Sequence, residues 1–172
     1  EEPRTRTVMI KHIVGKPFGM ITGYMQKVDP EGNLVYESTG SPARSDVYQI
    51  LGNGVADLTG GLNNSFSWKR IRLDALIDFK FGGDLYSGTN VRLTQAGLHK
   101  QTLVNREGGM VVKCVIQNGT DSNGKPIYEP FTKTLNQRET RDYWANLGER
   151  AQENFVYDAS FVKLRQISLE YS

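Results

Sequence analysis

Apolar and polar residues alternate with a period of two on both sides of residues 69 and 70. The alternation covers residues 62–68 and 71–81, which is typical of two strands that each have one apolar face. Placing Lys69 and Arg70 in a two-residue turn predicts a hairpin whose register sorts side chains by polarity. This register pairs Trp68 with Ile71, Phe66 with Leu73, Leu62 with Ile77, Ser67 with Arg72 and Ser65 with Asp74, with Asn64 and Leu76 as exceptions.

Two environments accommodate the apolar face of this hairpin. One is the core of a soluble β-sandwich, and the other is the lipid around a transmembrane β-barrel. A membrane-crossing strand needs about 9 to 11 residues, and the segment 71–81 has eleven. Trp68 near the turn and Phe79 and Phe81 at the far end suit aromatic residues at two membrane interfaces. Because half-buried strands occur in both classes of protein, this pattern alone leaves both environments open.

A further long strand is predicted at the end of the sequence, over residues 158–171, and a shorter β-rich run covers residues 6–14. The apolar positions of the last strand change phase near Arg165. One β-bulge there would return them to the same face of a sheet. The apolar positions are Val162 and Leu164 before the change, and Ile167, Leu169 and Tyr171 after it.

Residues 83–155, between the hairpin and the last strand, show no sustained periodicity. Local patterns predict a helical turn or two within 88–103, a β segment over 110–117 and a short helix over 136–147. We therefore expect a long, weakly ordered loop. Such a loop is uncommon in a compact soluble domain, whereas outer-membrane barrels combine short periplasmic turns with long extracellular loops. The asymmetry favours the barrel.

The composition excludes several classes of protein. No segment reaches 18 consecutive apolar residues, so we expect no membrane-spanning helix. The net charge of +2 is scattered along the chain, which argues against nucleic acid as a partner. The single cysteine, Cys114, excludes a framework of internal disulfides. The sequence lacks an initiator methionine and stops inside a strand-like pattern, so we expect part of a longer chain.

The last strand carries a motif that resembles one protein family. Residues 155–171 read FVYDASFVKLRQISLEY, which is similar to the pattern Y-x-D-A-S-F-x-K-L-R-x-x-x-L-x-Y of SusC/RagA-type TonB-dependent transporters of the Bacteroidetes outer membrane. Glycine-rich segments between residues 15 and 87, and shorter matches between 102 and 144, resemble other family segments in the same order. Ala56 departs from the pattern, because proline is usual there. The resemblance extends over residues 15–171.

This resemblance implies an all-β fold, a late part of a large antiparallel transmembrane β-barrel of about 22 strands with long extracellular loops. Residues 1–172 would form a partial C-terminal region of that barrel, without a plug domain and without the closing strands. The implied function is nutrient import across the cell outer membrane. TonB would act through the missing N-terminal part, and a SusD-like lipoprotein would help to capture oligosaccharides or peptides. A soluble, β-rich, glycan-binding surface module is the competing interpretation.

The sequence contains little that points to catalysis. His12 and His99 are far apart and form no paired metal-binding motif, and no nucleophile has a base at a recognisable spacing. We therefore predict no enzymatic activity, no cofactor and no metal. We interpret Asp158, Lys163 and Arg165 as a structural charge network that braces the bulged strand.

Four residues are candidates for contact with a ligand or partner. On the polar face of the hairpin, Asp74 and Asp78 would face the barrel lumen, either as ligand contacts or as charges of a hydrated wall. In the long loop, where Tyr143 and Trp144 would be exposed among polar residues, they would either pack within the loop or stack on sugar rings and bind the lipoprotein. The apolar face of the hairpin would contact outer-membrane lipid.

Overall fold

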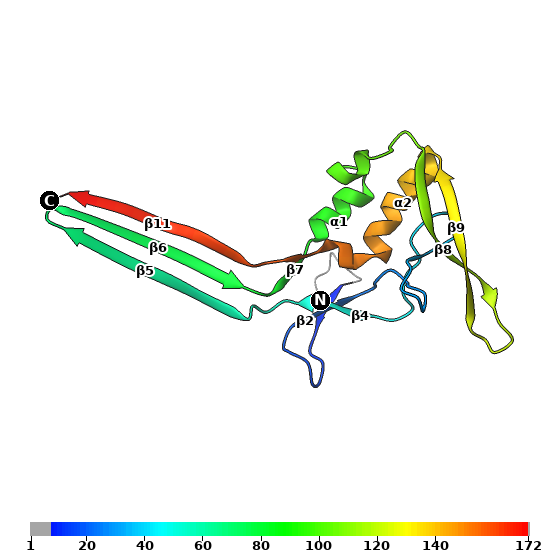
Figure 1. The fold of residues 1–172 in the computed structure, drawn as a ribbon, viewed down its shortest axis with the longest axis horizontal. Helices are drawn as coiled ribbons and strands as arrows, with labels where there is room; N and C mark the ends of the chain where they lie inside the picture. Colours follow the sequence, from blue (N-terminus) through cyan, green and yellow to red (C-terminus); the bar gives the residue numbers. More distant parts are fainter. Residues whose placement is uncertain (1–7, 172) are drawn as a thin grey trace.

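The computed structural model describes residues 8–171 and has an elongated shape (Figure 1). A three-stranded sheet, called the arm below, extends away from a lobe that contains the helices and the other strands. Strands hold 48% of the described residues and helices 18%, which confirms the all-β prediction, although no barrel closes within residues 8–171. The start of the predicted strand over 6–14 and both ends of the predicted unit 1–172 lie outside the described residues.

The arm is an antiparallel sheet in the order β11–β6–β5. It consists of β5 (Leu58–Trp68), β6 (Ile71–Phe81) and β11 (Phe161–Tyr171). The hairpin of β5 and β6 has the predicted register, with Trp68 opposite Ile71 and every other predicted pair in place. Lys69 adopts a φ of 54°, the left-handed conformation that a tight hairpin turn needs.

The predicted bulge in the last strand is confirmed. The register between β11 and β6 shifts between Leu164 and Gln166, so Arg165 is the extra residue. The predicted strand over 158–171 is divided, because a short strand, β10 (Val156–Asp158), pairs with β7 (Asp84–Tyr86) before β11 begins. This short pair connects the arm to the lobe (Figure 1).

The lobe contains two further sheets and the helices. One sheet has the order β1–β2–β4, and in the other β3 is parallel to β8 while β8 and β9 form an antiparallel hairpin. The bounds are β1 (Met9–Lys11), β2 (Met20–Gly23), β3 (Val35–Tyr36), β4 (Gln49–Asn53), β8 (Met110–Thr120), β9 (Pro126–Leu135), α1 (Gly88–Gln95), α2 (Gln137–Arg150), and the 3₁₀ turns η1 (Lys100–Leu103) and η2 (Gln152–Phe155).

The expected weakly ordered loop over 83–155 is wrong, because this segment forms most of the folded lobe. Strand β9 was missed since Pro126 and Pro130 interrupt its pattern, and proline is normally excluded from central strands. In the structure β9 is an edge strand. Proline, which lacks a backbone N–H, is tolerated in edge strands because one side of the strand has no neighbouring strand to accept a hydrogen bond. Helix α2 confirms the predicted short helix and begins with a capping box formed by Asn136 and Glu139.

The apolar core lies in the lobe. All fully buried apolar residues of the described chain are there, and none lies in the arm. Phe155 and Leu135 are each 1% exposed. The N-terminal segment is joined to this core by Gln152, whose side chain accepts a hydrogen bond from the Tyr24 amide at 2.9 Å. Contacts between segments so far apart in sequence explain why local patterns did not predict the lobe.

Candidate functional site

One face of the arm is a continuous apolar surface. Alternate residues of β6 point to this face, and their partners on β5 and β11 are apolar except near Asn64 and Gly60. The ring of Phe79 covers Gly60, where a Cβ would approach it to 2.6 Å. The large apolar side chains that remain exposed on this face are Leu58, Leu62, Phe66, Trp68, Ile71, Phe81, Val162, Leu164, Ile167, Leu169 and Tyr171.

The predicted division of the hairpin into one apolar face and one polar face is thus confirmed. Phe66 and Trp68 are 64% and 68% exposed, so neither side chain is enclosed in a protein core. Apolar patches on soluble monomers seldom exceed a few hundred Å². An eleven-residue, three-stranded face of this kind indicates a surface that is covered by something apolar.

The opposite face of the arm is polar and carries both predicted aspartates. Asp74 forms an ion pair with Arg72 at 3.0 Å and accepts a hydrogen bond from Ser65. Asp78 pairs with Arg165 across the strands. Both carboxylates therefore have polar partners on the same face of the sheet. A shallow groove of about 270 Å³ runs over this face beside Asp74.

The charge network predicted for the bulged strand is only partly correct. Arg165 pairs with Asp78 instead of Asp158. Asp158 accepts hydrogen bonds from the backbone N–H and the hydroxyl of Ser160, at 2.8 and 2.6 Å. These bonds hold the turn between β10 and β11, so the two charges act at separate places. The Ser160 hydroxyl in turn accepts a hydrogen bond from the Gly82 amide, 2.9 Å away.

Tyr143 and Trp144 lie on α2, within the helix predicted over 136–147, but neither has the exposure that was expected. Both are half-buried. The ring of Tyr143 stacks on that of Tyr36, with centroids 6.4 Å apart and planes at 7°, and meets Trp144 edge to face at 5.1 Å. Burial raises the pKa of the Tyr143 hydroxyl well above its usual value, with a smaller contribution from Tyr36. Tyr143 therefore packs inside the lobe, while Trp144 borders a pocket.

That pocket has a volume of about 530 Å³ and lies beside the first turns of α2. Among its lining residues, only Trp144 had been predicted from the sequence as a contact residue. The lining set is Thr94, Gln95, Ala96, Gly97, Thr102, Arg106, Gln137, Arg138, Thr140, Arg141 and Trp144. Four of these residues, Arg138, Thr140, Arg141 and Trp144, lie on α2 at spacings that place them on one side of the helix. The sequence could have indicated this polar side only if the packing of the helix against its neighbours had been known.

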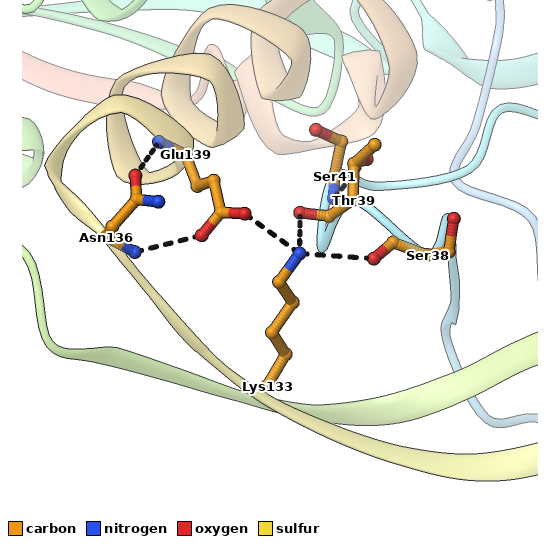
Figure 2. A network of polar contacts seen from close by, with 6 residues as sticks. All are labelled: Ser38, Thr39, Ser41, Lys133, Asn136 and Glu139. Carbon is orange, nitrogen blue, oxygen red and sulfur yellow. Dashed lines mark hydrogen bonds and ion pairs between the residues drawn. The ribbon is translucent and has the colours of Figure 1, made fainter.

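A polar network fixes the other side of α2 (Figure 2). The Lys133 ammonium lies 2.9 Å from a carboxylate oxygen of Glu139 and donates to the carbonyl oxygens of Ser38 and Thr39. Glu139 also accepts a hydrogen bond from the backbone N–H of Asn136 at 3.0 Å. The bond from the Asn136 backbone lowers the pKa of Glu139, and Lys133 adds to this effect. The network joins β9, α2 and the 38–41 segment.

The two histidines have structural contacts. His12 stacks on Phe18 with ring centroids 4.1 Å apart, and His99 Nδ1 accepts a hydrogen bond from the Gln101 amide at the start of η1. Asp121 holds the β8–β9 turn by accepting from the amides of Asn123 and Lys125, each at 2.8 Å. Within residues 8–171, no cluster of three or more His, Cys, Asp or Glu side chains is arranged to hold a metal ion. No helix in this range has the length and apolar content to cross a bilayer.

Comparison with known proteins gives one line of support for the family resemblance. No family model matches the chain. The chain is similar to the TonB-dependent receptor P39 of Formosa agariphila, with 25% identity over 153 residues. The similarity covers 87% of this chain, which spans 13% of the length of that receptor. The comparison therefore supports the coarse assignment of this chain to the TonB-dependent receptors.

Proposed function

We propose that this chain is part of the outer-membrane β-barrel of a SusC/RagA-type TonB-dependent importer, with β5, β6 and β11 as membrane-crossing strands. The observation that carries the proposal is the arm, in which three neighbouring strands of eleven residues share one exposed apolar face and one polar face. This strand length suits a tilted crossing of the bilayer. The similarity to a TonB-dependent receptor points in the same direction.

Lipid is the partner that best fits the apolar face. Aromatic side chains lie at both of its ends, with Trp68 and Tyr171 near the hairpin turn and Phe79 and Phe81 near the lobe. Two aromatic bands that flank an aliphatic centre are typical of outer-membrane barrels. The face with Asp74 and Asp78 would line the hydrated lumen, where paired charges are inexpensive.

The edges of the arm favour a larger sheet. Within residues 8–171, β5 and β11 each have a hydrogen-bonding edge without a neighbouring strand. Unpaired backbone groups are too costly in lipid to remain open, so membrane strands pair into closed barrels. Further strands of the same barrel would complete both edges.

The lobe would lie on the outer side of the membrane. The short turn at Lys69 and Arg70 suits the periplasmic end, and the lobe is attached at the other end of the arm (Figure 1). The β8–β9 hairpin projects from the lobe away from the arm and offers a surface for a partner (Figure 1). We propose that this surface contacts a SusD-like lipoprotein during import of oligosaccharides or peptides, with energy supplied through TonB.

The membrane assignment is tested by the local environment of two adjacent side chains. In the full-length protein in lipid vesicles, with Cys114 replaced by serine, Phe66→Cys and Ser65→Cys are each labelled with a nitroxide. The label at 66 should be relaxed mainly by oxygen, which concentrates in lipid, and the label at 65 by a water-soluble nickel chelate. Equal access of the nickel chelate to both labels would contradict the proposal and favour a soluble surface module.

The role of the lobe is tested by shortening the β8–β9 hairpin. Residues 118–127 are replaced by Asn-Gly, which joins the paired residues Gln117 and Tyr128 by a two-residue turn. We expect weaker co-purification of the lipoprotein and slower uptake, with normal membrane insertion. An Arg70→Ala variant at the β5–β6 turn, outside this surface, is the control and should leave both unchanged. Unchanged co-purification and uptake in the shortened protein would exclude this hairpin as the contact.

A further inference from the structure

The pocket beside α2 contains two side chains whose hydrogen-bonding capacity is unused. Among the described residues, three buried side-chain polar atoms have no partner, and two of them, Thr140 Oγ1 and Trp144 Nε1, belong to residues that line this pocket. Thr140 is only 1% exposed. An unpartnered buried polar atom destabilises a protein unless something binds it. The Thr140 hydroxyl can both donate and accept a hydrogen bond, and the Trp144 indole N–H can donate one, so together they suit a polar ligand.

The two other threonines of the pocket, Thr94 and Thr102, are already hydrogen-bonded within the lobe. The hydroxyl of Thr94 accepts a hydrogen bond from Gln101 at 2.9 Å, and the hydroxyl of Thr102 donates to the His99 carbonyl at 2.7 Å. Thr140 and Trp144 therefore differ from their neighbours. Since they lie four residues apart on α2, their side chains share one side of the helix.

The charge of the lining indicates the sign of the ligand. Arg106, Arg138 and Arg141 line the pocket, and no aspartate or glutamate does. Arg141 is paired with Asp142 at 2.8 Å, whereas neither Arg106 nor Arg138 has an ion-pair partner among residues 8–171. The guanidinium of Arg106 reaches over Gly97, where a Cβ would lie 3.7 Å from Nη2. Arginine presents paired N–H donors that match a carboxylate or sulfate.

The remaining lining suits a hydroxylated ring. Gln95 and Gln137 supply amide groups, and Trp144 supplies an aromatic side chain. The volume of about 530 Å³ is within the range of about 300 to 1,000 Å³ typical of small-molecule sites. A free inorganic anion would leave most of this volume, and the unpartnered groups of α2, without contacts.

We propose that this pocket binds an anionic saccharide, a sugar ring that carries a carboxylate group. Arg106 and Arg138 hold the anionic group, and Thr140 and Trp144 donate hydrogen bonds to ring substituents. The proposal deepens the proposed function and rests on it for the exposure of the lobe to the cell exterior. It makes the lobe a recognition site for acidic glycans, separate from the aspartate-lined face of the arm.

The test is calorimetric titration of the full-length protein in detergent with D-glucuronate, D-glucose and inorganic sulfate as probes. Glucuronate should bind at least tenfold more tightly than either glucose or sulfate. Arg106→Gln and Arg138→Gln should each weaken glucuronate binding about tenfold, the loss expected for one charge-assisted hydrogen bond. Arg70→Gln, which removes the same charge at the distant hairpin turn, should have no effect.

Thr140→Val separates a binding role from a structural one. The substitution removes the unpartnered hydroxyl while keeping the shape, so the ligand-free variant should unfold at a higher temperature than the parent. Glucuronate binding should nevertheless weaken. A less stable variant, or one that binds glucuronate as well as the parent, would overturn the role of Thr140.

Absence of glucuronate binding, equal binding of glucose, or sulfate binding as tight as glucuronate would each overturn the proposal. None of these results depends on membrane insertion or uptake, so they leave the proposed import function to its own tests. Conversely, a soluble lobe that binds glucuronate would retain this site even if the nitroxide experiment excluded a membrane arm.

Discussion

The Arg165 guanidinium Nε lies 2.5 Å from the Asp78 carboxylate, across two neighbouring strands of the arm. Arg165 is the bulged residue of β11. The bulge therefore has two effects: it places a cation beside Asp78 on the polar face, and it returns the following apolar residues to the apolar face. A regular strand would have turned Ile167, Leu169 and Tyr171 toward the polar side.

The Asp78–Arg165 pair distinguishes a wet face from a dry one. The side chains of Asp78 and Arg165 are 28% and 52% exposed, so Asp78→Asn should cost about 0 to 1 kcal/mol of unfolding free energy, as for surface pairs. Urea unfolding of the full-length protein in lipid vesicles measures this cost. A loss of about 3 to 5 kcal/mol would indicate that Arg165 is left unpaired in a dry environment.

Arginine scanning across the bulge should show the alternation of faces. Ile167 pairs with Ala75 at the middle of β6, and Ser168 pairs with Asp74. In a bilayer, Ile167→Arg should cost about 2 to 4 kcal/mol because it places a charge near the midplane of the lipid. Ser168→Arg, one residue later, should cost much less since it adds a cation beside Asp74. Equal costs at the two positions would exclude lipid contact for this face.

The Lys133–Glu139 network should make the stability of the lobe depend on acid. The pKa of Glu139 is lowered in the folded state. Its contribution to the stability of the folded lobe is therefore complete above pH 4.5, the ordinary pKa, and is lost as the pH falls through the lower pKa of the folded state. Thermal unfolding of the lobe should therefore shift to lower temperature below pH 4.5. Glu139→Gln should unfold at lower temperature at neutral pH and show a smaller further loss in acid.

Glu153 should have the opposite dependence on pH. Burial raises its pKa above 4.5. The backbone N–H of Gln26 donates a hydrogen bond to Glu153 Oε1 at 3.0 Å and partly opposes this increase. Its charged form is disfavoured in the folded state, so its contribution to stability falls as the pH rises from 4.5 through the folded value. Glu153→Gln keeps an acceptor for Gln26 and should raise the melting temperature at neutral pH. The exposed Glu149→Gln should leave it unchanged.

The arm could be predicted from the sequence because its signals are local. The hairpin register follows from the alternation on either side of Lys69, and the bulge follows from the change of phase at Arg165. Neither prediction needs knowledge of a distant segment. The positive φ of Lys69 shows that a hairpin turn forms even without the glycine that usually favours it.

The lobe could not be predicted in the same way. Its core joins residues such as Val35 and Leu135, which lie a hundred positions apart, and its strands are short or interrupted by proline. The placement of Tyr143 against Tyr36 depends on this folding, so exposure of the aromatic pair was the wrong expectation. The pocket residues Arg106 and Thr140 come from the turn after η1 and from α2, and only the folded lobe brings them together.

The direct pairing of β6 with β11 has a consequence for how such a protein can change. Phe161 is paired with Lys80, next to the end of β6 at Phe81. The chain therefore leaves the sheet after Phe81 and re-enters it at Phe161, beside the point where it left. Residues 82–160 are therefore an insert between two adjacent strands of the arm. Related genes could lengthen, exchange or lose this insert, and acquire a new ligand, while the strands on either side assemble unchanged.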